Sequence, residues 1–194
     1  MTDAPPLATP IPDELLLARA RGGDSGAREE LFCRHFPVAQ RVARRLLGDD
    51  QDALDAVQDG FLKAVRHLHE FDGRSSFRTW LLRVVSNAAL DLGRRKGRRP
   101  SIRLAENDAE PVDARDADPA ANLHRQDLRR ALDTALATLS HATRSTFVLF
   151  AEAELSYKEI ADAQRIPIGT VMSRLHFARR KLQALLGGIE ENQG

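Results

Sequence analysis

The sequence predicts an all-α protein of two small helical domains. Its hydrophobic content of 42% is enough for real cores, aromatic residues make up only 5%, and no stretch alternates β-branched residues as a strand would. A segment with one Gly, three Pro and many acids separates two parts with helical periodicity. We therefore expect a disordered start (1–12), a helical domain (13–96), a flexible acidic linker (97–121) and a second helical domain (122–194).

Helix start and stop residues divide the beginning of the first domain. Asp13 is expected to cap a short helix. Asp24 or Ser25 can cap the next helix, which should end at Gly48. Pro37 interrupts that second pattern and is expected to kink or reset it.

Two longer helices complete the first domain. One is expected over 52–70 and the other over 77–95, joined by a turn containing Asp-Gly and Ser residues at 71–76. The fourth helix places Trp80 at an inward position, which favours a core role over stacking on a base. The third should bury Leu54, Val57, Phe61, Leu62, Val65 and Leu68, and leave Asp52, Asp55, Gln58, Asp59, Lys63 and Arg66 outward.

The second domain contains the most informative pattern. Ser156 to Glu159 form a capping box before a short helix, residues 165–167 break it, and a basic helix follows from Ile168 to about Leu186. Two helices joined by a tight turn, the second of them basic, are typical of a helix-turn-helix that enters a DNA groove. The alternative is an ordinary basic helix that completes a helical bundle. The capping box, the short turn and the basic second helix together favour DNA binding.

Charge is segregated along the chain although the formal net charge is only +1. Residues 94–103 contain six basic residues and no acid, whereas the following residues 104–118 are mostly acidic where charged. Such a basic cluster indicates a polyanionic partner.

No catalytic, cofactor or metal pattern stands out. The six histidines are scattered, no Gly-rich phosphate loop is present, and the single cysteine, Cys33, excludes an intramolecular disulfide. No segment approaches the roughly 20 apolar residues of a membrane span. We expect a cytoplasmic protein without cofactor, metal, enzymatic activity or membrane insertion.

Two segments resemble one family. LSYKEIADAQRIPIGTVMSRLHFARRKL is similar to region four of the extracytoplasmic-function (ECF) sigma factors of the sigma-70 family, bacterial subunits that direct RNA polymerase to promoters. DALDAVQDGFLKAVRHLHEFDGRSSFRTWLLRVVSNAALDLGRR is similar to region two of the same family, in the right order. The resemblance implies promoter-specific transcription initiation, with the linker threading toward the polymerase cleft, although composition alone equally allows a plain tether.

The resemblance assigns three surfaces. The outward face of the third helix would dock on the polymerase core, through Asp52, Asp55, Gln58 and Asp59. The loop at 71–76 and the helix after it would capture and melt the −10 element, with a base pocket of Arg74, Ser75, Ser76 and Asn87 and phosphate contacts from Arg78, Arg83, Arg94 and Arg95. The last helix would read the −35 duplex through Thr170, Met172, Ser173, Arg174, His176, Phe177 and Arg180.

Four positions depart from the family pattern. One of them, Asp59, keeps the charge of the usual Glu but is shorter. Met172 and Phe177 stand where Lys or Arg is common, so contacts with thymine methyl groups should matter more for recognition of the −35 element. Arg165 stands where Gly often makes the turn, which predicts either mild backbone strain or a shifted turn.

The implied partners are RNA polymerase core, promoter DNA and an anti-sigma factor.

Two other functions are alternatives to that of a sigma factor. A stand-alone helix-turn-helix regulator would bind a palindrome without polymerase. A helical protein-interaction module would show only weak, salt-insensitive association with DNA. The acidic third-helix face and the loop at 71–76 argue against both.

Overall fold

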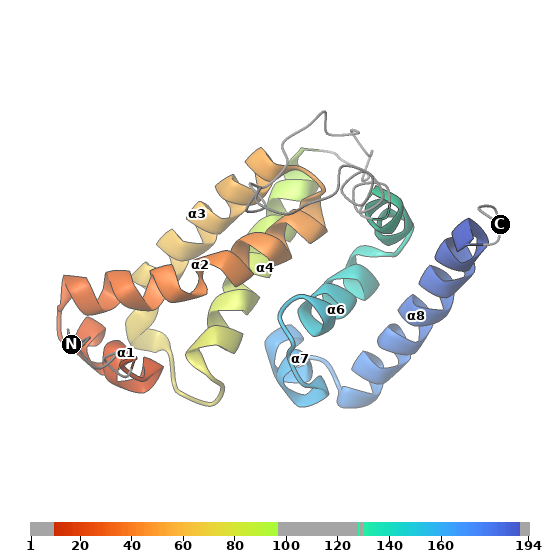
Figure 1. Ribbon diagram of the computed structural model, residues 1–194. Helices are drawn as coiled ribbons and strands as arrows, with labels where there is room; N and C mark the ends of the chain where they lie inside the picture. Colours follow the sequence, from red (N-terminus) through yellow and green to blue (C-terminus); the bar gives the residue numbers. More distant parts are fainter. Residues whose placement is uncertain (1–9, 97–127, 129, 191–194) are drawn as a thin grey trace, which may run out of the picture.

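The protein is helical in every regular element that the structure describes. A computed structural model describes residues 10–96, 128 and 130–190, with side chains to Leu186. The expected linker at 97–121 lies outside these residues, and so do residues 1–9 of the start that was expected to be disordered (1–12). Figure 1 shows two groups of helices lying side by side, α1 to α4 in one and α6 to α8 in the other.

The N-terminal domain is a bundle of four helices in which α3 and α4 pack closely. Its apolar core includes Leu31, Val42, Val57, Leu81 and Val85, none of which is exposed. The helices are α1 (Asp13–Arg21), α2 (Ser25–Leu47), α3 (Asp50–Arg66) and α4 (Phe77–Arg95), with a 3₁₀ turn, η1 (Leu68–Glu70), after α3.

Side-chain caps begin three of these helices. Asp24, Asp49 and Ser76 each accept a backbone N–H from the first turn of the helix that follows. Gly48, in the left-handed conformation at φ 73°, ends α2 as expected. The expectation for Asp13 was wrong: Pro12 is the N-cap residue, and the Asp13 carboxylate binds side chains of α2 instead.

Pro37 does not divide α2, which continues through it to Leu47. Gly60 likewise has a packing role within α3. A Cβ atom on Gly60 would lie 2.9 Å from Val85 Cγ2 and 3.0 Å from Val85 Cα. Because Val85 belongs to α4, the missing side chain sets how closely α3 and α4 approach.

The C-terminal domain has a helix at residues 130–137 followed by α6 (His141–Ala151), α7 (Tyr157–Gln164) and α8 (Ile168–Glu190). Ile160, Val171, Leu175 and Ala178 are buried where α7 and α8 meet the rest of the domain. The expected start near Leu123 lies outside the described residues.

The two domains pack against one another, which the sequence did not predict. Val148 and Leu149 of α6 belong to the same apolar cluster as the core of the N-terminal domain. Arg45 of α2 donates to Glu152 Oε1 at 2.7 Å and to Asp133 Oδ1 at 2.6 Å. Burial alone would lower the pKa of Arg45, but these two carboxylates outweigh it and raise the pKa.

A variant Gly60→Ala tests the close approach of α3 and α4. The added methyl group must push Val85 or its backbone away, so we expect the free energy of unfolding to fall by about 1–3 kcal/mol. Thermal and urea unfolding followed by circular dichroism would measure it. Gly169→Ala is the control, because its Cβ meets nothing within 4 Å; equal losses in the two variants would contradict this account.

Candidate nucleic-acid interface

The loop before α4 is fixed at both of its ends. Phe71 is buried and packs on Trp80, with ring centroids 5.4 Å apart, and on Phe77 at 6.2 Å. At the other end, Ser76 Oγ accepts the N–H of Thr79 at 3.1 Å. The loop residues between these anchors are largely exposed, so their amides and hydroxyls are available to a ligand.

The tip of the loop has its own local order. Arg74 N–H donates to Asp72 Oδ1 at 3.1 Å, and Gly73 adopts φ 72°. The guanidinium of Arg74 pairs with Asp72 at 3.0 Å but remains largely exposed. Trp80 is 8% exposed and packs on Phe71 and Phe77, which confirms its expected place in the core.

One face of α4 lines a cleft between the domains. The cleft has a volume of about 780 Å³, with Arg83, Asn87 and Asp91 on one side and Gln164, Arg165 and Arg174 on the other. Burial and the nearby charge of Arg165 lower the pKa of Arg83. Two like charges therefore face one another across the cleft, which favours a polyanion entering it.

The remaining basic residues expected to hold phosphates lie along α4. Arg78 is partly buried near the N-terminal end, and Arg94 and Arg95 are exposed near the C-terminal end. Arg94 pairs with Asp91, and Arg95 Nη2 lies 3.5 Å from Asp59 Oδ2. These pairs are exposed and hence weak, so phosphates can compete for both guanidinium groups.

The outward face of α3 presents three of the four residues expected to meet the polymerase. Asp55, Gln58 and Asp59 are exposed. Asp52 was expected on this face, and that placement was wrong: its side chain is 3% exposed and forms an ion pair with Lys96 at the end of α4. Its carboxylate therefore joins α3 to α4 inside the domain.

Helical periodicity also predicted the wrong position for two apolar side chains of α3. Leu62 and Val65 were expected in the core, but they are 56% and 38% exposed. Gly60 and Ala64 occupy the buried face in their stead, and at Gly60 the α4 residue Val85 lies too close for a larger side chain. The sequence therefore did not predict the exposed apolar patch of Leu62 and Val65. These two residues lie one and two turns after Gln58 on the same face of α3.

The helix-turn-helix forms as the sequence predicts. Ser156 Oγ accepts the N–H of Glu159 at 3.3 Å, and Glu159 Oε2 accepts the N–H of Ser156 at 2.9 Å, which completes the capping box. Arg165 ends α7 in the left-handed conformation, at φ 55° and ψ 47°, which is the strained outcome of the two expected there. The turn then leads through Pro167 into α8.

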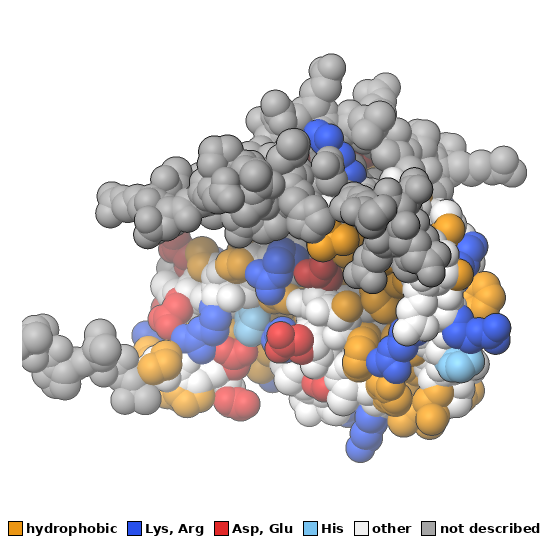
Figure 2. Space-filling model, turned by 45° about the vertical axis from the view of Figure 1, so that its right-hand side comes forward, with side chains coloured by type: hydrophobic (Ala, Val, Ile, Leu, Met, Phe, Trp, Pro, Cys, Tyr) orange, Lys and Arg blue, Asp and Glu red, His pale blue; other side chains and the backbone are white. Residues whose placement is uncertain are grey.

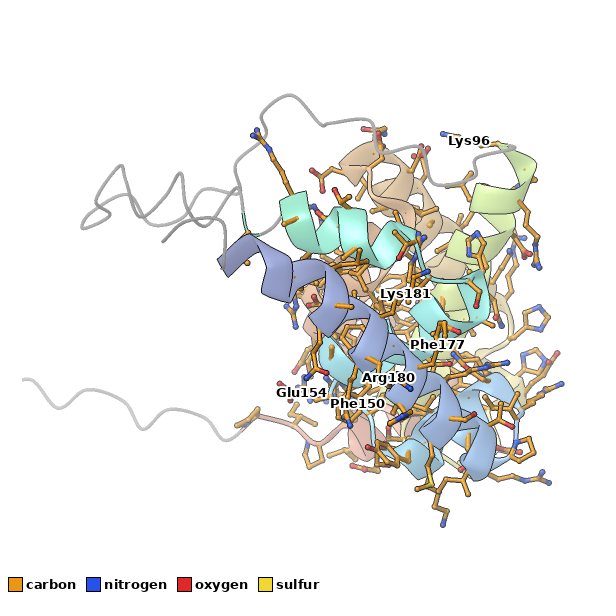
Figure 3. All side chains as sticks on the ribbon, turned by 90° about the vertical axis from the view of Figure 1, so that its right-hand side faces the viewer. Lys96, Phe150, Glu154, Phe177, Arg180 and Lys181 are labelled. Atoms are coloured by element: carbon orange, nitrogen blue, oxygen red, sulfur yellow. The ribbon has the colours of Figure 1, made fainter. Side chains whose placement is uncertain are left out.

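The outward face of α8 carries most of the residues expected to read duplex DNA. Met172, Ser173, His176, Phe177 and Arg180 are all exposed, and Thr170 is partly exposed. Figure 3 shows Phe177 and Arg180 along this helix. On the right-hand side of Figure 2, basic, hydrophobic and histidine side chains lie together over this part of the molecule.

Arg174 is turned away from that face. Its Nη1 donates to Gln164 Oε1 at 3.1 Å, and Gln164 in turn donates to Ser145 Oγ at 3.1 Å. This polar network joins α6, α7 and α8. Arg174 therefore orients α8 within its domain, and its side chain lines the cleft and not the outward face of α8.

A hydrogen bond joins the two candidate DNA-binding elements. Thr79 Oγ1, in the first turn of α4, donates to Glu159 Oε1 of α7 at 2.9 Å, and Ser76 Oγ lies 2.9 Å from Thr79 Oγ1. Hydrogen bonds from the Ser156 hydroxyl and amide lower the pKa of Glu159, and the bond from Thr79 adds to them. The caps of α4 and α7 are thus linked through one carboxylate.

Neither a metal cluster nor a membrane helix is found among the described residues. No group of three or more His, Cys, Asp or Glu side chains there could hold a metal ion. No helix in that part of the chain combines the length and apolar character needed to cross a bilayer.

The comparisons with known proteins agree with this geometry. A family model described as Sigma-70 region 2 matches residues 31–99, and one described as Sigma-70, region 4 matches residues 129–182. The ECF RNA polymerase sigma-E factor of Haemophilus influenzae is 33% identical over 184 residues, which cover 91% of this chain and 96% of that protein. The RNA polymerase sigma-H factor of Pseudomonas aeruginosa is 31% identical, over 90% and 93% of the two chains.

One relative is longer. The ECF RNA polymerase sigma factor SigE of Mycolicibacterium smegmatis is 35% identical over 84% of this chain, but the match spans only 64% of that protein.

Solved structures show the same architecture. CnrH in complex with the cytosolic domain of CnrY matches with a TM-score of 0.69 and 29% identity, over 91% of this chain and 97% of that one. The sigma factor RpoE in complex with the anti-sigma factor NepR from Bartonella quintana has a TM-score of 0.63 at 24% identity, over 82% and 96% of the chains, which is a likeness in fold.

Two helical modules, one of them a helix-turn-helix, define the class of DNA-binding transcription factors. The chain belongs to the ECF sigma factor family. It is therefore a transcription initiation factor and not an enzyme.

Arg165→Gly tests the backbone strain at the turn of the helix-turn-helix. A left-handed conformation costs a residue with a Cβ atom about 1–2 kcal/mol, and Gly avoids this cost. Gly also has more conformational freedom in the unfolded chain, which offsets part of the gain in stability. We expect the free energy of unfolding to rise by about 0.5–1 kcal/mol in urea titrations. Arg165→Ala also removes the charge facing Arg83 but keeps the Cβ atom, so a gain as large as that of Arg165→Gly would exclude strain as the cause.

Proposed function

We infer that the chain binds the RNA polymerase core and directs it to specific promoters. Its N-terminal domain captures and melts the −10 element, and its C-terminal domain reads the −35 element. The observation that carries this function is the occurrence, on one chain of the sigma family, of an exposed acidic helix face and two separate basic DNA-binding faces. A stand-alone regulator would need only one of them.

The polymerase-binding surface is the outward face of α3. Asp55 and Asp59 supply negative charge, Gln58 supplies hydrogen bonds, and the exposed Leu62 and Val65 supply apolar area. Charged groups steer the encounter with a basic partner, while the apolar side chains gain free energy when they leave water. Asp52 is left out of this surface because its carboxylate is buried against Lys96.

The −10 surface is the loop at 72–76 with one face of α4. Loop amides and the hydroxyls of Ser75 and Ser76 read the edge of an unstacked base, together with Arg74 and Asn87. Phosphates are held by four arginines of α4, namely Arg78, Arg83, Arg94 and Arg95.

The −35 surface is the outward face of α8. Ser173, His176 and Arg180 offer hydrogen-bonding groups to base edges or phosphates, and Thr170 lies nearest the start of the helix, where backbone amides favour a phosphate. Met172 and Phe177 offer apolar contact to thymine methyl groups. Their exposed fractions, 54% and 55%, support a role outside the core.

Promoter binding requires the two domains to separate. The −10 and −35 elements lie about 25 base pairs apart, roughly 85 Å at about 3.4 Å per base pair. In the packed arrangement, Arg83 and Asn87 share a cleft with the C-terminal domain. The face of α8 is open already, so duplex contact can precede strand capture.

The protein works in the cytoplasm, where polymerase and promoters are. An anti-sigma factor is its regulatory partner, since the fold resembles that of a sigma factor solved with such an inhibitor. Such a partner would act by covering the faces of α3 and α4.

Run-off transcription with core polymerase and genomic DNA fragments tests the function. We expect new start sites when the protein is added, because core polymerase alone does not select promoters. If the protein leaves start sites unchanged and instead binds a palindrome tightly without polymerase, it is a stand-alone helix-turn-helix regulator.

The double variant Asp55→Asn, Asp59→Asn tests the polymerase-binding face. Neutralising two exposed charges should weaken binding to core by about tenfold at low salt and by less at high salt, because salt screens exposed charges. Fluorescence titration of labelled core would measure the affinity. Glu29→Gln removes an exposed charge from α2 and should change nothing; if it weakens binding equally, the effect is one of net charge and not of this face.

Replacing Phe177 with Arg tests the apolar contribution to −35 recognition. The new cation should add about one phosphate contact, which steepens the slope of log affinity against log salt by about 0.9. Phe177→Ala should leave that slope unchanged and reduce preference for thymine-containing sites. Both are measured by anisotropy on duplexes from mapped promoters. Equal sequence preference in Phe177→Ala and the unmodified protein would contradict contact with thymine methyl groups.

A further inference from the structure

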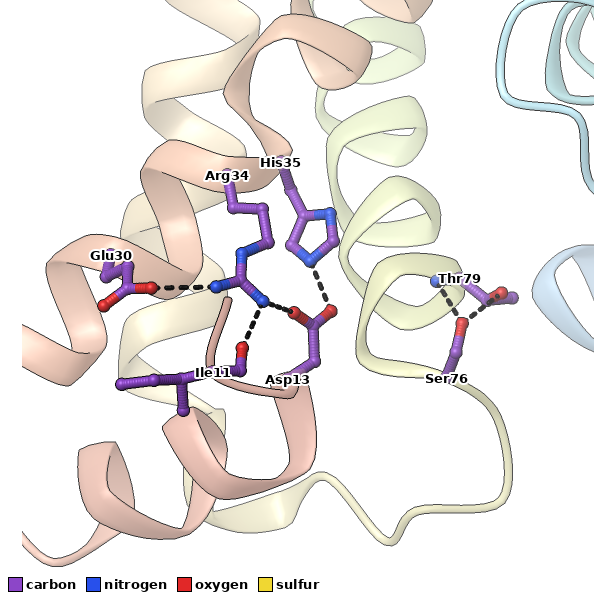
Figure 4. A network of polar contacts seen from close by, with 7 residues as sticks. All are labelled: Ile11, Asp13, Glu30, Arg34, His35, Ser76 and Thr79. Carbon is purple, nitrogen blue, oxygen red and sulfur yellow. Dashed lines mark hydrogen bonds and ion pairs between the residues drawn. The ribbon is translucent and has the colours of Figure 1, made fainter. Parts of the chain in front are cut away.

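The first helix of the chain, α1, is held at both ends. At its start, Asp13 Oδ1 accepts from Arg34 Nη1 and Asp13 Oδ2 lies against His35 Nε2, each at 2.7 Å. Arg34 also donates to the carbonyl oxygen of Ile11 and to Glu30 (Figure 4). This network attaches the N-terminal end of α1 to α2.

The other end of α1 contacts the strand-capture loop, which we define as residues 72–76. Arg21, the last residue of α1, donates from Nε to the carbonyl oxygen of Leu68 at 3.1 Å and from Nη2 to the carbonyl oxygen of Phe71. The Arg21 guanidinium also lies over the Phe71 ring, with Cζ 5.6 Å from its centroid. One side chain thus holds the backbone directly before the loop.

These contacts fix where the strand-capture loop begins. The two carbonyls belong to the first residue of η1 and to the residue that follows η1, and one guanidinium fork can bind two acceptors at once. Phe71 is buried against Trp80 and Phe77, so its carbonyl marks the last anchored residue before Asp72. Ser76 fixes the far end of the loop as the cap of α4.

We propose that Arg21 is a positioning residue for capture of the melted −10 strand. It sets the conformation of the strand-capture loop without touching DNA, and α1 acts as a strut between that loop and α2. The family match for region 2 begins at residue 31, so α1 lies outside it. This inference rests on the proposed function, because it assumes that the loop reads a base.

The role predicts a defect confined to strand capture. Without the guanidinium, both carbonyls can bind water, so the domain stays folded while the loop samples more conformations. The α3 face and the α8 face are formed by other contacts and should be unaffected. A residue that served only stability would disturb every activity of the domain together.

The experiment uses the full chain assembled with core polymerase. The probe is a labelled single-stranded oligonucleotide carrying the non-template −10 sequence of a promoter mapped by run-off transcription. The variants are Arg21→Ala, Arg21→Lys and the matched control Arg19→Ala, which removes an exposed ion pair with Asp24 from the same helix. Core affinity and −35 duplex affinity are measured on the same preparations.

We expect Arg21→Ala to weaken strand binding about five- to tenfold with core and duplex affinities unchanged. Arg21→Lys, which can reach one carbonyl but not both, should lie between, and Arg19→Ala should match the unmodified protein. The proposal is overturned if Arg21→Ala binds the strand normally, or if it loses core affinity to the same degree.

Two variants of the proposed base pocket, one in the loop and one in α4, separate this inference from the proposed function. Arg74→Ala and Asn87→Ala should each weaken strand binding. If both do so and Arg21→Ala does not, only the positioning role fails. If neither does, the loop and this face of α4 are not the strand-binding element and both proposals fail.

Discussion

The buried guanidinium of Arg144 is the constraint around which the two domains are arranged. It is 3% exposed and donates to the carbonyl oxygens of Leu136 and Ala137, at the end of the helix over 130–137, and of Leu46, at the end of α2. Burial lowers its pKa, yet an arginine stays charged in proteins. A buried charge must keep its acceptors, so this residue ties a helix end of each domain to the same point.

The same packing gives the two DNA-binding faces different access. The face of α8 points outward, whereas Arg83 and Asn87 of α4 look into the cleft opposite Arg165. The bond between Thr79 and Glu159 closes the arrangement next to the strand-capture loop. The repulsion between Arg83 and Arg165 opposes packing of the two domains against one another. The balance between the packed and separated states is therefore set by a few polar contacts and by the apolar area buried between the domains.

Local sequence patterns predicted the helices well, because caps and periodicity are local. The bounds of α4, the capping box at Ser156 and the left-handed Arg165 are all confirmed. Periodicity failed where contact with a neighbouring element decides which side chains are buried. At Gly60 the close approach of α4 makes this the buried face of α3, so Leu62 is exposed. Asp52 is buried because its carboxylate pairs with Lys96. The contacts of Arg21 with Leu68 and Phe71, and of Arg144 with Leu46, span long sequence separations, and no local pattern encodes them. The roles of the site residues came from the family resemblance, and burial then separated Asp52 and Arg174 from the others.

The position of Trp80 has an optical consequence. It is the only tryptophan in the sequence, and it lines the cleft while packing on Phe71 and Phe77. Indole emission responds to hydration, and region 4 contributes no second indole to obscure it. Movement of one domain away from the other is therefore reported by the protein's own emission, without an attached dye, at Trp80 in α4.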